Sequence, residues 1–242
     1  MIRLILSMVL GIALILPFPA MLEARTYYVA PSGDDSANGL ASKPEGGLSG
    51  PFKTTGRAVK ALRGGDTVHL RAGIYNEQVT VSASGSPNLP IVIASFPNEW
   101  AVIDGLDTLP GSTWGTLFQV TGSHVIIQDM EIRNSKWIGV EITGAYSQAL
   151  NIHSHHHMEH GLLLRADYTL ADKCRIWWNA KRNESGLAYA KGGWATGISA
   201  GRYSRHATIR NCVVWNNWGE GLSTFESEYT VLEDNIVYDN QT

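Results

Sequence analysis

The stretch HVIIQDMEI, residues 124–132, aligns without gaps with HATIRNCVV, residues 206–214. Three further copies of the same template occur around residues 151, 173 and 234. The column that contains Asp129 has successive steps of 22, 22, 38 and 23 residues, and its members are Asp129, Asn151, Lys173, Asn211 and Asp234. Self-similarity at such a period is the signature of a repeat architecture, in which every repeat is one structural unit.

Three neighbouring columns are mostly apolar and are expected to face the interior. They are Ile127, Ala149, Ala171, Ile209 and Leu232; Met130, Ile152, Cys174, Cys212 and Asn235; and Ile132, Ser154, Ile176, Val214 and Val237. A second strand follows in each repeat after a recurrent glycine, at residues 139–142, 161–164, 197–200 and 221–224. Its alternation is typical of a strand with one buried face.

A repeat of about 22 residues cannot bury its apolar stripe alone, whereas coils stacked about 4.8 Å apart bury a continuous one. The Asp129 column suits a polar ladder at a bend, because Asn tolerates a left-handed backbone and can bond to neighbouring coils. Leucine-rich repeats have a similar period, but their leucine spacing is missing. We therefore predict an all-β fold, a single-stranded right-handed parallel β-helix.

Charge and the N-terminal sequence restrict partners and location. Only 17% of the residues are charged and the net charge is −3, which excludes a basic surface for nucleic acid. An apolar run from Leu4 to Leu16 is followed by Pro17 and Pro19, the layout of a signal peptide over residues 1–24 with cleavage after Ala24. We expect a secreted or periplasmic monomer without stable membrane association.

Residues 25–122 precede the regular repeats. Pro51 to Leu62 has helix-like apolar spacing and is followed by the turn residues 63–66, so we predict an amphipathic helix that caps the open end of the stack. Short strands are expected at 67–72, 78–81, 91–94 and 101–104. Residues 123–242 form the regular coils, and the end at Thr242 without a closing cap predicts a truncated solenoid.

The opening motifs carry a family resemblance. YYVAPSGDD at 27–35, PFKT at 51–54, GDTV at 65–68 and RAGIYNE at 71–77 resemble the opening of secreted pectate-lyase-like right-handed β-helix proteins, in particular polysaccharide lyase family 9 and its uncharacterised relatives. The resemblance implies the fold and an acidic polysaccharide as partner. These motifs build the cap and carry no catalytic group.

The step of 38 residues between Lys173 and Asn211 places an insertion of about 15 residues at 180–194. The resemblance implies a substrate groove along the glycine-initiated strands, so this insertion would form one wall of it. β-Elimination at a uronate needs a base and a cation. Lys or Arg is the usual base in the resembling enzymes, which makes Arg165, Lys191 and Arg202 candidates, with His160 as an acid–base alternative.

Other residues on that side are candidates for binding sugar. Glu141, Glu220 and Glu226 lie at outward positions or strand ends, and Trp194 and Trp218 lie in turns, where indole faces can stack on sugar rings. The resemblance makes Ca²⁺ a possible cofactor, but its ligands are not identified. The loop 183–191 has one acid where family 9 lyases have an Asp cluster, and the histidines at 153–160 do not form a closed metal set. We predict no metal ligands.

Several functions stay open at this stage. The expected one is a polysaccharide lyase acting on uronate-containing polysaccharide. The alternatives are a non-catalytic carbohydrate-binding or cell-surface protein, and a glycoside hydrolase or uronate epimerase on the same fold. Cys174 and Cys212 occupy one column of adjacent coils, where free buried thiols are favoured over a disulfide.

Overall fold

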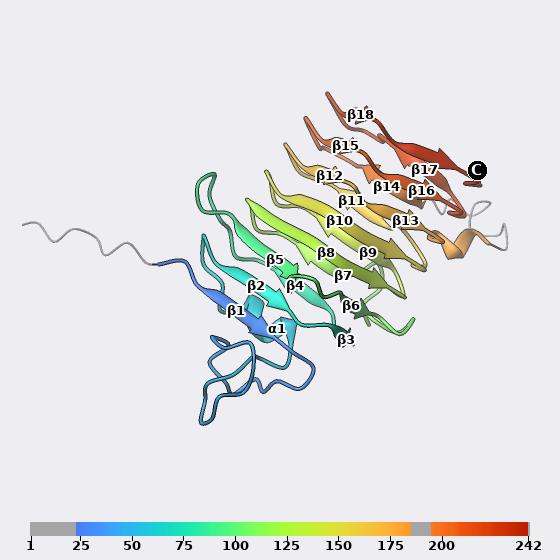
Figure 1. Cartoon of the computed structure of the whole chain (residues 1–242). Coiled ribbons are helices and arrows are strands. Elements are labelled where there is room, and N and C mark those ends of the chain that lie inside the picture. Colours follow the sequence, from blue (N-terminus) through green and yellow to red (C-terminus); the bar gives the residue numbers. More distant parts are fainter. Residues whose placement is uncertain (1–22, 185–194, 242) are drawn as a thin grey trace, which may run out of the picture.

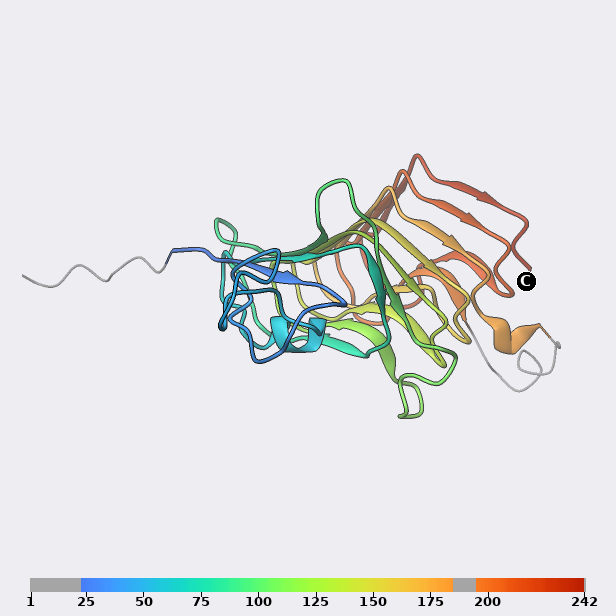
Figure 2. The ribbon, with the colours of Figure 1, turned by 60° about the horizontal axis from the view of Figure 1, so that its bottom comes forward.

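The chain winds into stacked coils of parallel β-strands (Figure 1). The structure, a computed structural model, describes residues 23–184 and 195–241. Seen from a second direction, the coils follow one another along a single axis from the N-terminal to the C-terminal end (Figure 2). The predicted all-β parallel β-helix is thereby confirmed.

Each regular coil contributes strands to three faces. The first face contains β1 (Thr26–Val29), β2 (Thr67–Leu70), β5 (Ile91–Ser95), the first half of β8 (Val125–Arg133), the first half of β10 (Gln148–His155), β12 (Leu170–Asp172), β15 (Thr208–Arg210) and β18 (Val231–Glu233). The second contains β3 (Gly73–Tyr75), β6 (Ala101–Asp104), the second halves of β8 and β10, β13 (Arg175–Trp177), β16 (Val213–Trp215) and β19 (Ile236–Tyr238). The third contains β4 (Val79–Val81), β7 (Thr116–Val120), β9 (Ile138–Ile142), β11 (Leu162–Leu164), β14 (Thr196–Ala200) and β17 (Glu220–Ser223).

The predicted register is confirmed. Ala149 pairs with Ile127 on one side and with Ala171 on the other, and Ile176 pairs with Ser154 and Val214. All five members of the Asp129 column have φ between 51° and 58°, the left-handed conformation that the bend between the first two faces requires. The ladder is formed in part, since Asn151 Nδ2 donates to Asp129 Oδ1 at 2.8 Å.

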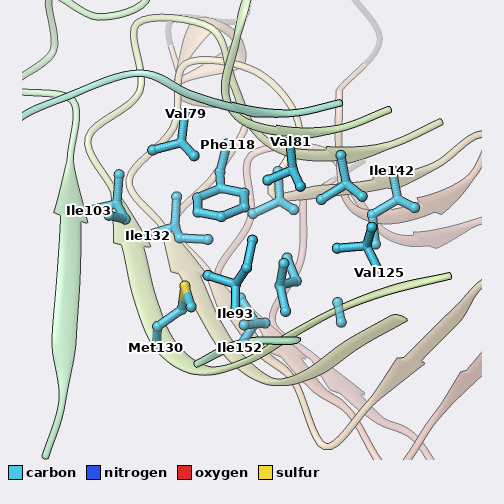
Figure 3. Packing of buried hydrophobic residues seen from close by; sticks show 14 of the residues in the cluster. Val79, Val81, Ile93, Ile103, Phe118, Val125, Met130, Ile132, Ile142 and Ile152 are labelled. Atoms are coloured by element: carbon cyan, nitrogen blue, oxygen red, sulfur yellow. The ribbon is translucent and has the colours of Figure 1, made fainter. Parts of the chain in front are cut away.

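The apolar columns meet inside the coils (Figure 3). Phe118, Met130, Ile132 and Ile152 are fully buried and belong to one continuous hydrophobic cluster. Burying each such side chain contributes about 2 to 3 kcal/mol. This packing fixes the third face, on which the candidate site lies, against the other two.

A second, buried polar ladder marks the turn between the second and third faces. Its members are Ser135, His157, Asn179, Asn217 and Asn240. Asn217 Oδ1 accepts from the backbone N and from Nδ2 of Asn179, both at 3.0 Å. The recurrent glycine makes room for this ladder, because a Cβ at Gly161 would lie 2.7 Å from Asn179 Nδ2.

The predicted helix is shorter than expected, since α1 covers only Thr55–Val59. Its free amides are bound by carboxylates of the opening motifs: Asp35 accepts from the N–H of Thr54, and Glu77 accepts from those of Thr55 and Gly56. After Val59 the chain tightens into a turn, where Asp66 accepts from the N–H of Arg63. In both views α1 lies at the N-terminal end of the stack (Figures 1 and 2).

Two further properties of the described residues complete the fold. Cys174 and Cys212 are buried free thiols, as predicted from their place in one column of adjacent coils. Across residues 23–184 and 195–241, no helix has the length and apolar character to span a membrane.

Candidate functional site

A groove of about 580 Å³ lies on the third face, over β11, β14 and β17. Its lining falls into three rows along the stack. The row at the strand starts is His160, Thr196 and Glu220; the middle row is Leu163, Ser199 and Ser223; and the row at the strand ends is Arg165, Gly201, Arg202 and Phe225. The uncharged middle row lies between two rows that contain titratable groups. The predicted groove strands and the predicted residues His160, Arg165, Arg202 and Glu220 thus meet in one place.

Arg165 lies at the edge of this groove and is anchored there by a buried carboxylate. Its Nη1 donates to Glu141 Oε1 at 2.9 Å, and the Glu141 side chain is only 8% exposed against 40% for Arg165. Glu141 Oε2 also accepts from Thr116 Oγ1 and Gln119 Nε2, on the adjacent strand β7. A cation anchored in this way can bind an anionic group with little reorganisation.

Gly201 leaves space for the Arg165 side chain. A Cβ at Gly201 would lie 3.3 Å from Arg165 Cγ, so a larger residue would require the arginine stem to shift by a few tenths of an ångström. The glycine therefore lets the stem of Arg165 lie across the neighbouring coil while its guanidinium reaches back to Glu141.

Arg202 is the more exposed of the two arginines in the groove. It pairs with Glu226 at 3.0 Å, but both side chains are about half exposed, so water competes with this pair. The guanidinium also lies 5.5 Å from the ring centre of Phe225, which lines the groove. Arg202 is thus free to turn toward a bound molecule at small cost.

His160 is fixed by hydrogen bonds to the next coil. Its Nδ1 accepts from the backbone N–H of Thr196 at 3.1 Å and lies 3.0 Å from Thr196 Oγ1. Burial, assisted by the charge of Arg165, lowers the pKa of His160 to about 4. At neutral pH the ring is therefore uncharged, with its proton on Nε2, and it is suited to donate a hydrogen bond.

The remaining predicted site residues are placed differently. Glu141 lies beneath the groove rather than in its lining, and Glu226 borders it only through Arg202. Trp218 is half-buried and outside the lining, and its backbone N–H donates to Asn179 O. The structure thus places these three beneath or beside the groove, and their binding of sugar stays a prediction. Lys191 and Trp194 lie outside the described residues.

The other histidines of the His-rich stretch point elsewhere. His153 packs between Trp100 and Trp177, and His155 lies 3.3 Å from Glu131. Both are on the second face, and His157 belongs to the buried ladder. Of this stretch, His160 is the member that lines the groove.

The resemblance makes Ca²⁺ a possible cofactor, so we ask whether the side chains around the groove could bind it. Within the described residues, no three side chains of His, Cys, Asp or Glu gather closely enough to hold a metal ion. Two of the three carboxylates at the groove are also engaged, Glu141 with Arg165 and Glu226 with Arg202, which leaves Glu220 as a single carboxylate ligand. The described residues do not fit a calcium site, and no step below depends on one.

Known proteins resemble this chain over most of its length. Pectate lyase L of Dickeya chrysanthemi is 25% identical over 224 residues, which cover 87% of this chain and 49% of that protein. The uncharacterized protein YwoF of Bacillus subtilis is 30% identical over 128 residues, half of this chain and 26% of its own length. This chain therefore spans about half the length of the pectate lyases that it matches.

Solved structures share the architecture. The crystal structure of pectate lyase Pel9A superposes with a TM-score of 0.73 and 23% identity, covering 92% of this chain and 56% of that one. A rhamnogalacturonan lyase superposes with a TM-score of 0.57 and 16% identity. The family model described as the Pel9A-like, right-handed beta helix region matches residues 27–242. The resemblance expected from the opening motifs is confirmed, and the chain belongs to the Pel9A-like right-handed β-helix family.

Proposed function

We propose that this chain forms the β-helix of an exported polysaccharide lyase, which cleaves a uronate-containing polysaccharide by β-elimination in the groove on β11, β14 and β17. The observation that supports this most is the pair of arginines, Arg165 and Arg202, at the edge of a groove with a neutral histidine opposite. Family membership and the pectate lyase relatives support the same class of reaction.

The chemistry assigns different roles to the two arginines. A base removes the proton beside the uronate carboxylate, the electron pair forms a C–C double bond, and the glycosidic C–O bond at the next carbon breaks as the departing oxygen takes a proton from water. The carboxylate gains charge in this step, and the anchored Arg165 stabilises that charge. Arg202, half exposed and weakly paired, is the proton acceptor that we favour among the described residues.

His160 and Glu220 complete the proposed site from the opposite side. Because His160 Nδ1 is already an acceptor for Thr196, its Nε2–H is left to donate to a sugar oxygen. Glu220, which pairs in register with Thr196 on the neighbouring strand, can accept from sugar hydroxyls. Both groups bind and orient the chain without joining the proton transfer.

One assay tests the proposal. The mature protein is incubated with polygalacturonate, alginate and rhamnogalacturonan, with and without Ca²⁺, and the absorbance of the unsaturated product is followed. We expect product from at least one polymer and a loss of product in Arg165→Ala. New reducing ends without this absorbance would show a hydrolase, and binding without any product would show a carbohydrate-binding protein; either result would contradict the lyase proposal.

A further inference from the structure

Two tryptophans lie side by side in the turns that lead into the third face. Trp114 precedes β7 and Trp137 precedes β9, and their ring centres are 5.3 Å apart with 33° between the planes. Trp114 is 56% exposed, whereas Trp137 is half-buried and its Nε1 is a buried donor without a partner. Trp137 is therefore the inner ring of the pair, and Trp114 is the outer ring, which is exposed to solvent.

An arginine from a later coil clamps this pair. The guanidinium carbon of Arg182 lies 4.8 Å from the ring centre of Trp114 and 5.8 Å from that of Trp137. Arg182 is itself ion-paired with Glu159, whose side chain is only 2% exposed. The four residues thus form one connected cluster from the segments before β7, β9, β11 and β14.

The exposure of Trp114 is not explained by packing. More than half of its surface stays in water although the ring contacts Trp137 and Arg182, and its φ of 60° is a left-handed conformation that costs a non-glycine residue free energy. A large aromatic ring that is fixed and half in water is typical of a surface that binds flat, partly apolar groups such as pyranose rings.

The cluster lies close to the groove, both along the chain and along the stack. Glu159 directly precedes His160, which lines the groove, and β7 is two coil spacings from β11, about 10 Å along the stack. A polysaccharide lying along the groove would therefore pass the cluster. Arg182 and the exposed Lys136, beside Trp137 in sequence, offer cations for uronate carboxylates.

We propose that Trp114, supported by Trp137 and Arg182, is a sugar-stacking subsite that extends the groove toward the N-terminal coils and binds a uronate ring of the same chain. This rests on the proposed function of the groove. It predicts that only oligomers long enough to reach from Arg165 to Trp114 gain affinity from the tryptophan.

The test measures binding of galacturonate trimer and octamer to the mature protein by isothermal titration calorimetry. The titration is run at low temperature so that cleavage is slow, and the oligomers are checked for integrity afterwards. In Trp114→Ala we expect affinity for the octamer to fall by about three- to tenfold and affinity for the trimer to stay unchanged. Trp114→Phe, which keeps a ring face, should restore most of the octamer affinity. Trp178→Ala is the matched control, because that tryptophan is 49% exposed but packs on His156.

The possible outcomes separate the two proposals. Equal octamer affinity in Trp114→Ala and Trp178→Ala, with trimer binding intact, would overturn the subsite and leave the groove standing. Wild-type protein that binds neither oligomer would overturn the groove itself. Trimer binding that Trp114→Ala removes and Arg165→Ala leaves intact would show a separate site and contradict the proposed extension.

Discussion

Glu141 Oε1 lies 2.9 Å from Arg165 Nη1, so that a buried carboxylate of one coil holds a guanidinium of the next coil at the edge of the groove. Both oxygens of Glu141 are used inside the protein, since Oε2 accepts from Thr116 and Gln119. In the proposed enzyme Glu141 is therefore a positioning residue, and Arg165 is the group that meets the substrate.

This relationship predicts a graded loss of activity. Arg165→Ala removes the cation and should lower kcat/KM on the cleaved polymer by about a hundredfold to a thousandfold. Glu141→Gln keeps the shape but loses the charge-assisted bond, and should lower kcat/KM by about tenfold. Arg210→Ala, which breaks an ion pair with Asp172 on the first face, is the control. Wild-type activity in Glu141→Gln would show that Arg165 needs no anchor.

The pH dependence of kcat/KM distinguishes the candidate bases. Arginine and lysine have ordinary pKa values above 10, so the basic form is scarce at neutral pH and the rate should rise up to about tenfold per pH unit toward the alkaline side. A His160 base, with its pKa lowered to about 4, would instead give a flat profile above about pH 5. Arg202→Ala and Lys191→Ala identify the base, since its loss removes the alkaline rise while KM changes little. A flat pH profile in the wild type would exclude both Arg202 and Lys191 as the base.

His160 also makes an observable contribution to stability. Its folded pKa of about 4 lies below the ordinary histidine value, so the folded state favours the neutral ring. The stability that this ring supplies is complete above pH ~6.5 and is lost as the pH falls from there toward about 4. An NMR titration should place the His160 midpoint near the lower value. Urea unfolding of His160→Gln should show a smaller stability loss over that window; a midpoint near pH ~6.5 would contradict the buried, hydrogen-bonded ring.

Export predicts a defined N-terminus. The backbone N of Arg25 donates to Asp66 Oδ1 at 2.8 Å, so cleavage after Ala24 would create a charged amine already paired with a carboxylate. Mass spectrometry of the exported protein should find Arg25 as the first residue. Leu10→Arg, which interrupts the apolar run, should keep the precursor inside the cell. An exported protein that retains the leader would contradict the predicted cleavage.

The register of the coils could be predicted because it is a local property. Each column recurs once per coil, and the interior accepts only apolar or self-bonding side chains, so the pattern around Asp129 determines which strands pair. The groove followed from the same register, which brought His160, Arg165 and Arg202 onto one face. The start of α1 did not follow, because Asp35 and Glu77, which lie far away in sequence, bind the backbone amides of residues 54–56.

The roles of single outward residues could not be predicted in the same way. The alternation along the strands places both Glu141 and Arg165 outward. It does not reveal that Arg165 and the neighbouring side chains cover Glu141. The tryptophan pair has a signal in the sequence, since the step of 23 residues from Trp114 to Trp137 is that of an ordinary coil. The buried ladder also has a signal in the sequence: its members Ser135, His157, Asn179, Asn217 and Asn240 repeat at 22, 22, 38 and 23 residues, the steps of the Asp129 column.

The ladder gives a direct stability prediction. In Asn217→Ala the backbone N and Nδ2 of Asn179 lose their shared acceptor in the interior, and Asn240 Oδ1 loses the donation from Asn217 Nδ2. Buried groups without partners are costly, so the free energy of unfolding should fall by about 3 kcal/mol in urea titrations followed by circular dichroism. Asn216→Gly removes the neighbouring exposed asparagine side chain at a φ of 51°, which glycine adopts without strain, and should change stability by less than about 1 kcal/mol. Equal losses in the two variants would mean that the ladder follows the coil geometry instead of stabilising it.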